Sequence, residues 1–305
     1  MARLTVIITT YNRHLLLPRA IESVRDTGTD SEVIVVDDAS TDETMQYCKS
    51  MEGIRYIRLE KNQGTAAARN AGILASNSPY IAFLDDDDWR LPGSLPVQLS
   101  LLEKNETCGL VYGKVLFANQ ENELTGDSTI NNPSPQGDVL LELLKKNFIT
   151  LSTVVIRREC FNKLGLFDSS PKMLGLEDWD MWLRLSGYYS VLAVDKPVAV
   201  YRKPEKNSGQ WYSDLGRQFS KAADAYKQKW FQLPGVRSKL GAGFGRSKKK
   251  ILANASDIIL FSALNNSKSM REKGARVRSA VKCWPQNLLQ IKFYKVVIKA
   301  ILNRA

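Results

Sequence analysis

The chain has 305 residues, of which 44% are hydrophobic and 25% are charged, and this composition is typical of a folded protein with a sizeable core. No apolar run is long enough to span a bilayer, and the short run near the start lacks the cleavage site of a signal peptide. The four cysteines lie far apart and match no metal-binding or redox spacing, which favours reduced thiols in a cytosolic protein.

The net charge of +11 is unevenly distributed along the chain. Residues 1–211 contain 23 basic and 28 acidic residues, whereas residues 212–305 contain 20 basic and only 4 acidic residues. This change predicts an acidic catalytic or binding domain at residues 1–210, followed by a basic, mainly helical extension at residues 211–305. Such an extension is typical of chains that meet an anionic surface.

The first half of the chain alternates between strands and helices. Ser40 and Glu43 form a capping box, so the second helix is expected to begin at Ser40. Strands separated by short helices predict a parallel sheet with right-handed crossovers, in which ligands bind beyond the carboxyl ends of the strands. Strands are predicted at residues 4–10, 32–36, 54–59 and 80–84, and helices at residues 15–25, 40–50 and 64–75.

The second half of the predicted domain is less regular. Residues 119–136 and 169–176 read as loops. The remaining elements are strands at residues 110–118, 153–157, 189–194 and 199–201, and helices at residues 139–146, 158–164 and 177–185.

The basic extension is predicted to be helical, with an amphipathic helix at residues 286–303 that carries lysines on one face. Three interpretations of this helix remain open. It is a solvated helix packed on the rest of the chain, an interfacial helix on an anionic membrane, or, least favoured, a nucleic-acid-binding arm. No recognised nucleic-acid motif accompanies it, so no nucleic-acid partner is expected.

Four consecutive carboxylates, Asp85 to Asp88, follow the strand at residues 80–84. These side chains repel one another unless a cation lies among them, and oxygen ligands of this kind suit Mg²⁺ or Mn²⁺. The alternative is a solvated acidic turn at the end of a strand.

Five segments stand in the order and approximate spacing of the family 2 glycosyltransferases, and the resemblance covers roughly residues 3–205. It implies an α/β fold of the GT-A (Rossmann-like) type, with a mostly parallel sheet flanked by helices, and an inverting enzyme of the kind that builds bacterial surface polysaccharides. The segments are VIITTYNR at residues 6–13, VVDDASTD at 35–42, GTAAARNAG at 64–72, FLDDDDW at 83–89 and EDWDMWLRL at 177–185.

The resemblance also implies roles for individual residues on the donor side. Tyr11 resembles the family residue that lies against the nucleobase, and Asp38 resembles the one that accepts hydrogen bonds from the base and ribose. Asp85 and Asp87 match the family's metal-binding motif for Mn²⁺ or Mg²⁺, with Asp88 able to share the role. The remaining residues expected to bind the donor are Thr9, Arg69 and Asp86. Asp37 and Asp38 could alternatively cap a turn, and Arg69 could be a surface residue of a helix.

Asp178 resembles the family's catalytic base. A second carboxylate at Glu177 is expected to raise one of the two pKa values. The resemblance implies that Glu177 contacts the acceptor or orients its loop, and that Trp179 belongs to the acceptor site. The alternative is an amphipathic helix in which the acids are caps and Trp179 is part of the core. Many relatives have a histidine shortly after the position of Tyr201, whereas this chain has none there, which puts a third metal ligand in doubt.

The sequence thus favours an inverting glycosyltransferase that moves a sugar from a nucleotide diphosphate, with UDP as the favoured nucleotide, to a hydroxyl of a glycan or lipid-linked glycan. A cytoplasmic location is expected, and peripheral attachment to the inner face of the cytoplasmic membrane is left open. The alternatives are a nucleotidyltransferase, which usually has a glycine-rich loop where this chain has residues 9–13, and an inactive protein that binds nucleotide sugars.

Overall fold

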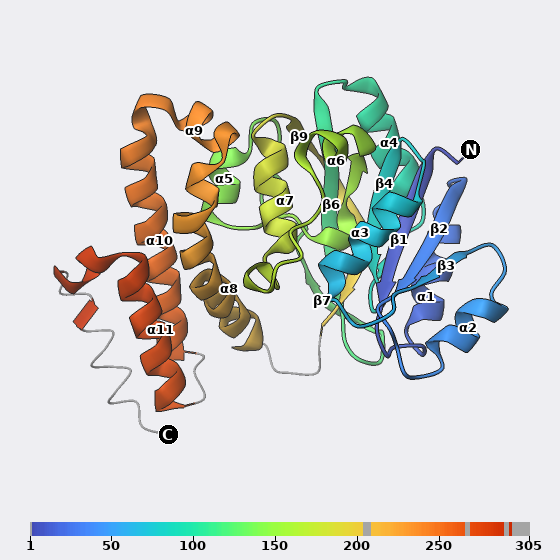
Figure 1. The fold of residues 1–305 in the computed structure, drawn as a ribbon, viewed down its shortest axis with the longest axis horizontal. Helices are drawn as coiled ribbons and strands as arrows, with labels where there is room; N and C mark the ends of the chain where they lie inside the picture. The colour runs from blue at the N-terminus through green and yellow to red at the C-terminus, as the bar shows by residue number, and fades with distance from the viewer. Residues whose placement is uncertain (1, 204–208, 266–268, 290–292, 295–305) are drawn as a thin grey trace. The chain divides into compact units, whose positions relative to one another are not determined.

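The computed structural model describes residues 2–203, 209–265, 269–289 and 293–294 (Figure 1). The chain forms two compact units. Unit 1 comprises residues 1–143 and 147–205, and unit 2 comprises residues 144–146 and 206–305. A division at residue 210 into a catalytic domain and an extension stays a prediction.

Unit 1 is built on one mixed sheet, in which strands pair in the order β3-β2-β1-β4-β8-β6-β9-β5 and β7 pairs with β6. The first four strands are parallel, while β8 runs antiparallel to both of its neighbours. The expected α/β fold with a mostly parallel sheet is therefore confirmed. The strands are β1 (Leu4–Thr10), β2 (Ser31–Asp37), β3 (Arg55–Arg58), β4 (Tyr80–Asp85), β5 (Trp89–Arg90), β6 (Cys108–Ala118), β7 (Leu124–Ser128), β8 (Val155–Arg157) and β9 (Ser190–Arg202).

Helices cover both faces of this sheet because alternate residues of its buried strands point to opposite sides. Val6 and Ile8 of β1 share a core with α1, whereas Ile7 lies against α3, where Gly72 leaves no room for a Cβ. The helices of unit 1 are α1 (Leu17–Arg25), α2 (Thr44–Ser50), α3 (Thr65–Ala75), α4 (Ser94–Lys104), α5 (Leu140–Lys145), whose last residues belong to unit 2, α6 (Arg158–Leu164) and α7 (Glu177–Ser186).

Several element boundaries differ from the sequence prediction. Helix α2 begins at Thr44 rather than at Ser40, because the Asp42 carboxylate accepts from the Thr44 amide at 3.0 Å while the Ser40 hydroxyl accepts from Asn12. The two short strands expected at residues 189–201 form one strand, β9. Two elements were not predicted. One is helix α4, and the other is strand β7, which lies inside the expected loop 119–136 and forms a hairpin with β6.

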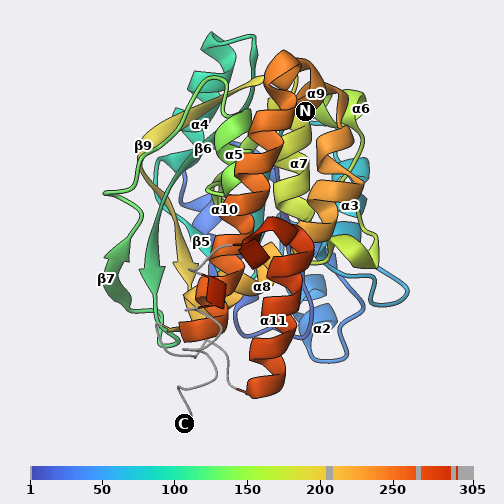
Figure 2. The same cartoon turned by 90° about the vertical axis from the view of Figure 1, so that its left-hand side faces the viewer.

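Unit 2 is helical, and an aromatic cluster of Tyr226, Trp230 and Phe231 lies in its core. Its helices are α8 (Gly209–Gln228), α9 (Pro234–Leu240), α10 (Phe244–Asn265) and α11 (Met270–Cys283), visible together in Figure 2. The basic helix expected at residues 286–303 falls mostly outside the described residues. Among the described helices, none combines the length and hydropathy that a membrane crossing requires.

Candidate active site

The carboxyl ends of three parallel strands bring the polar motif residues to one edge of the sheet. Thr9 of β1 pairs with Val36 on one side and with Asp85 on the other, and Thr10 pairs with Asp37. The residues that follow β1, β2 and β4 therefore emerge next to one another. This is the edge at which α/β sheets bind their ligands.

The two acids that follow β2 have different surroundings. The Asp37 carboxylate is fully buried and accepts hydrogen bonds from the Tyr56 hydroxyl at 2.6 Å and Arg58 Nη1 at 2.7 Å. The Asp38 carboxylate accepts from the backbone amides of Gln63 and Gly64, at 2.7 and 2.8 Å. Asp38 thus ties the end of β2 to the start of α3.

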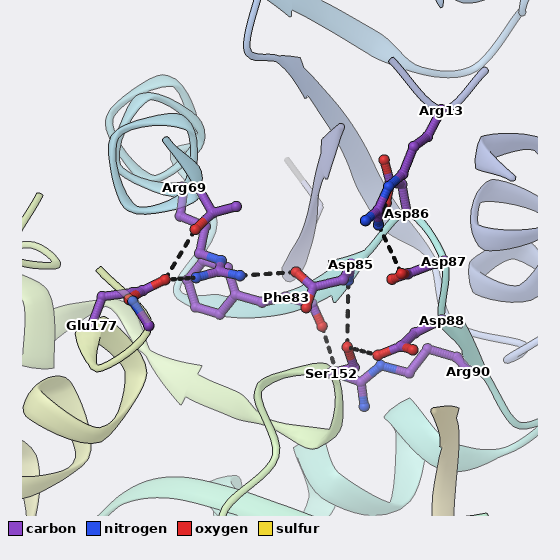
Figure 3. A network of polar contacts seen from close by, with 12 residues as sticks. Arg13, Arg69, Phe83, Asp85, Asp86, Asp87, Asp88, Arg90, Ser152 and Glu177 are labelled. Atoms are coloured by element: carbon purple, nitrogen blue, oxygen red, sulfur yellow. Dashed lines mark hydrogen bonds and ion pairs between the residues drawn. The ribbon is translucent and has the colours of Figure 1, made fainter. Parts of the chain in front are cut away.

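Two arginines neutralise part of the acid cluster at the end of β4, here defined as Asp85, Asp86, Asp87 and Asp88 (Figure 3). Arg13 Nη1 lies 3.0 Å from Asp86 Oδ1 and 2.7 Å from Asp87 Oδ2. Arg69 Nη2 lies 2.9 Å from Asp85 Oδ1.

Asp88 is held differently from the other three acids. Its buried carboxylate accepts from the Ser152 hydroxyl and from the Arg202 amide, so it connects β4 to the turn at residues 151–153 and to β9. These hydrogen bonds assign Asp88 to the architecture of the cluster, and we do not propose it as a shared metal ligand.

Burial and mutual repulsion raise the pKa values of three of these acids. Burial raises the pKa of Asp86 to about 6, although Arg13 opposes the shift. Burial and then the Asp85 charge raise the pKa of Asp87, and the same causes raise that of Asp88 well above its ordinary value. A cation at this place would relieve the repulsion that these shifts reflect.

The acid cluster fits a divalent cation that shares its coordination with a phosphate. No group of three Asp, Glu, His or Cys side chains converges as a metal cage within the described residues. However, Mg²⁺ in phosphate-handling enzymes takes only one or two carboxylates and completes its shell with water and substrate oxygens. Asp85 and Asp87, both partly exposed, match that donor set.

Arg69 connects the acid cluster to the start of α7. Arg69 is 5% exposed, and its Nη1 lies 3.5 Å from Glu177 Oε1 while its Nη2 contacts Asp85. Burial lowers the pKa of Arg69, but the Asp85 and Glu177 charges outweigh burial and the net shift is upward. Arg69 is therefore a buried cation rather than the surface helix residue that the sequence left open.

The buried carboxylate of Glu177 is already engaged by the protein. It accepts from the Thr65 hydroxyl at 3.0 Å and from the Gly175 amide, in addition to its ion pair with Arg69. These contacts favour its loop-orienting role over direct contact with an acceptor.

Asp178 is the second residue of α7 and is only partly buried. Its Oδ2 accepts from Asn147 Nδ2 at 3.0 Å, and its Oδ1 accepts from the Trp179 amide at 2.7 Å. Burial and then the neighbouring Glu177 charge raise its pKa to about 6, while Arg69 and Asn147 oppose the shift. A carboxylate with this pKa is ionised at neutral pH and is a better proton acceptor than an ordinary aspartate.

Trp179 and Tyr11, two further residues expected in the site, differ in their exposure. Trp179 is fully buried, and its indole Nε1 donates to the Leu143 carbonyl at 2.7 Å. A fully buried indole offers no surface to an acceptor, so the structure favours a packing role for Trp179, and its place in the acceptor site stays a prediction. Tyr11, in contrast, is 44% exposed beyond β1, where a flat ligand could lie against its ring.

Sequence reasoning missed three polar residues of this site. Arg13 is the last residue of the motif at residues 6–13. Because the end of this motif follows a predicted strand whose carboxyl end is expected at the same sheet edge as the acid cluster, it could have indicated a positive charge near those acids. Asn147 and Ser152 lie outside every motif, and only the fold brings them to Asp178 and Asp88.

Comparisons with known proteins identify related sequences. The sequence profile of "Glycosyl transferase family 2" matches residues 5–165. An uncharacterized glycosyltransferase of Rickettsia bellii is 32% identical over 205 residues, covering 66% of this chain and 29% of that protein. The succinoglycan biosynthesis protein ExoU of Rhizobium meliloti is 28% identical over 194 residues, covering 59% of this chain and 55% of that protein.

Solved structures share the fold at low sequence identity. The S. aureus TarS 1–349 structure in complex with UDP has a TM-score of 0.54 and 15% identity, covering 94% of this chain and 91% of that one. The mannosyltransferase PcManGT of Pyrobaculum calidifontis, in complex with GDP-Man and Mn²⁺, has a TM-score of 0.57 and 16% identity, covering 100% of this chain and 88% of that one.

The chain spans between 29% and 61% of the length of three curated relatives that it matches. The family profile nevertheless covers more than half of this chain, over the strands and helices that carry the acid cluster. The chain therefore belongs to glycosyl transferase family 2.

Proposed function

We propose that this chain is an inverting glycosyltransferase that uses a nucleotide-diphosphate sugar as donor and a glycan hydroxyl as acceptor. The observation that carries the proposal is the Arg69 bridge. Arg69 joins Asp85, on the side expected to hold the diphosphate, to Glu177, the residue before the candidate base Asp178. The groups that bind the donor and the groups that activate the acceptor would thereby be connected by one network of ion pairs.

The donor would lie beyond the carboxyl ends of β1, β2 and β4. Tyr11 offers an exposed ring to the nucleobase. Thr9, near the end of β1, and Asp38, directly after β2, would supply hydrogen-bonding groups. Asp85 and Asp87 would hold Mn²⁺ or Mg²⁺, which supplies positive charge to the departing diphosphate. Asp86 is 4% exposed and paired with Arg13, so we propose that it acts on the donor through that arginine.

The acceptor step would depend on Asp178. As the acceptor oxygen forms its bond to the anomeric carbon, the bond from that carbon to the diphosphate breaks and its electron pair leaves with the nucleotide. The hydroxyl proton passes to the Asp178 carboxylate. A single displacement of this kind inverts the anomeric configuration. General-base assistance of this type contributes typically about 10²- to 10⁴-fold in rate.

The finer assignments are a UDP-linked donor and a lipid-linked or polysaccharide acceptor. The TarS structures contain UDP or UDP-GlcNAc, and PcManGT contains GDP-Man, so both nucleotide classes are candidates. The relative ExoU is named for succinoglycan biosynthesis, which supports a polysaccharide product.

A thermal-shift panel of UDP- and GDP-linked sugars, each with and without Mn²⁺, tests the donor proposal, because a ligand that binds only the folded protein raises its apparent stability. We expect one nucleotide class to raise the melting temperature and an Asp38→Ala variant to lose the response. Asp138→Asn, an exposed acid before α5, is the control. A panel in which no nucleotide sugar stabilises the wild type would refute the proposal.

We also propose that unit 2 holds the protein on the inner face of an anionic cytoplasmic membrane. Residues 234–256 contain no acid, and α9 and the start of α10 expose five cations, Arg237, Lys239, Arg246, Lys249 and Lys250. Each basic residue near such a surface contributes about 1 kcal/mol.

Sedimentation of the full chain with vesicles containing phosphatidylserine tests the membrane proposal. The double variant Lys249→Glu/Lys250→Glu should sediment less, whereas Lys49→Glu/Lys104→Glu, with exposed lysines on unit 1, should behave as the wild type. Equal sedimentation of all three proteins would exclude the role.

A further inference from the structure

A pocket of about 440 Å³ lies in unit 1 between β6, β9 and the segment at residues 130–136. Figure 2 shows β6, β7 and β9 next to one another, and the segment follows directly after β7. None of the residues assigned above to donor, cation or base lines this pocket. It is therefore a separate concave site.

The pocket is preformed because its covering segment is fixed at both ends. At the start, the Thr129 amide donates to the Val115 carbonyl at 3.0 Å. At the far end, Gly137 and Val191 exchange two backbone hydrogen bonds, at 2.6 and 3.0 Å. Between them, the Tyr112 hydroxyl donates to the Pro135 carbonyl at 2.8 Å. A ligand entering here would meet ordered groups and would not pay for ordering a loop.

The charges in the pocket cancel. Lys114 is 8% exposed, and its ammonium lies 2.5 Å from Asp195 Oδ1 while it also donates to the Ile130 carbonyl. Ser134 donates to the same Asp195 oxygen at 3.3 Å. A phosphate or other anion would have to compete with Asp195 for the lysine, so the pocket favours a neutral ligand.

The other lining groups suit a polyhydroxylated ligand. Three exposed amides, Asn131, Asn132 and Gln136, each offer a donor and an acceptor on adjacent atoms, which matches neighbouring hydroxyls of a sugar ring. Ile130 and Pro133 add exposed apolar surface for the C–H face of such a ring. A few polar groups placed on apolar walls are typical of small-molecule sites.

We propose that this pocket binds a neutral saccharide unit of the acceptor glycan, at a distance from the unit that is glycosylated. The last part of β6, from Lys114 to Ala118, leads toward the acid cluster. Ala118 pairs with Arg202, and the Arg202 amide donates to Asp88. The step from Lys114 to Ala118 alone spans about 13 Å, so only an oligosaccharide, and not a single sugar, could reach from the pocket to the acid cluster. The inference rests on the proposed glycosyltransferase activity for the identity of the ligand as an acceptor.

Binding to the pocket can be measured without turnover. In two-dimensional NMR of the full chain, neutral trisaccharides of glucose, galactose, mannose and N-acetylglucosamine are titrated in turn, with inorganic phosphate as the anionic probe. We expect at least one trisaccharide to shift the side-chain amide signals of Asn131, Asn132 and Gln136. No shift with any trisaccharide, or shifts with phosphate alone, would overturn the proposal.

Variants connect the pocket to acceptor length. Asn132→Ala/Gln136→Ala should weaken trisaccharide binding and raise the KM for a long acceptor about fivefold, while the KM for a monosaccharide acceptor and the rate of donor hydrolysis stay unchanged. Gln46→Ala, an exposed amide on α2, is the control. Equal KM values for variant and wild type on long acceptors would overturn the inference. Absence of donor turnover in the wild type would instead count against the proposed function.

Discussion

Nη1 of Arg13 lies 2.7 Å from Oδ2 of Asp87, the carboxylate that matches the metal-binding position of the family motif. The same nitrogen is 3.0 Å from Asp86 Oδ1, so one cation is shared by two acids. A divalent ion on Asp87 would have to displace or crowd this guanidinium. Arg13 would therefore compete with the proposed metal ion for the acid cluster.

Replacing Arg13 by methionine should tighten Mn²⁺ binding when no nucleotide is present. The removed pair is half exposed and worth about 1 kcal/mol, so the Kd for Mn²⁺ should fall about fivefold, as measured by calorimetry or by electron paramagnetic resonance. Arg55→Met is a matched control, because Arg55 is equally exposed and pairs with Glu32 away from the cluster. Weaker Mn²⁺ binding in the Arg13 variant would mean that Arg13 supports the metal site rather than competing with it.

The hydrogen bond from Asn147 should set the pH dependence of the reaction. Asp178 has a pKa of about 6 and must be ionised to accept a proton, so kcat should rise with pH up to about 6 and then level off. The Asn147→Leu variant removes a donor that stabilises the ionised form, which should move the rising limb to higher pH. If the pH dependence of kcat is unchanged in Asn147→Leu, the rise of kcat with pH does not report the ionisation of Asp178.

The two buried indoles of α7 predict different losses of stability. Trp179 Nε1 donates to Leu143, whereas Trp182 Nε1 has no hydrogen-bond partner among the described residues. Trp179→Phe removes this buried hydrogen bond, so its free energy of unfolding should fall about 1 kcal/mol further than that of Trp182→Phe. Denaturant unfolding of both variants measures the difference. A rise in acceptor KM confined to Trp179→Phe, with stability unchanged, would restore Trp179 to the acceptor site.

The sequence predicted those parts of the fold that depend on local patterns. Strands β1, β2 and β4 are runs of buried, mainly apolar residues, so their positions along the chain and their carboxyl ends could be predicted before the structure. Helix α4 was missed because its apolar positions include Gln98, which is buried and bonds to Arg90 and to backbone carbonyls. No periodicity analysis assigns a glutamine to a core.

The site shows the same limit. The acid cluster and Asp178 could be named from the sequence, because each lies in a short motif with a characteristic pattern of residues. What each acid contacts depends on residues far away in sequence, such as Arg69 for Glu177 and Ser152 for Asp88. Sequence motifs alone therefore left two roles open for Glu177, contact with the acceptor or orientation of its loop, and its buried contacts favour the second.

The most direct test of this account is the Asp178→Asn variant, measured for both donor binding and sugar transfer. The substitution keeps the size of the side chain and its hydrogen bond from the Trp179 amide but removes the charge that accepts the proton. The account predicts a Kd for the nucleotide sugar within about twofold of wild type, together with a loss of kcat of about 10²-fold or more. Transfer at the wild-type rate by a correctly folded Asp178→Asn protein would contradict it.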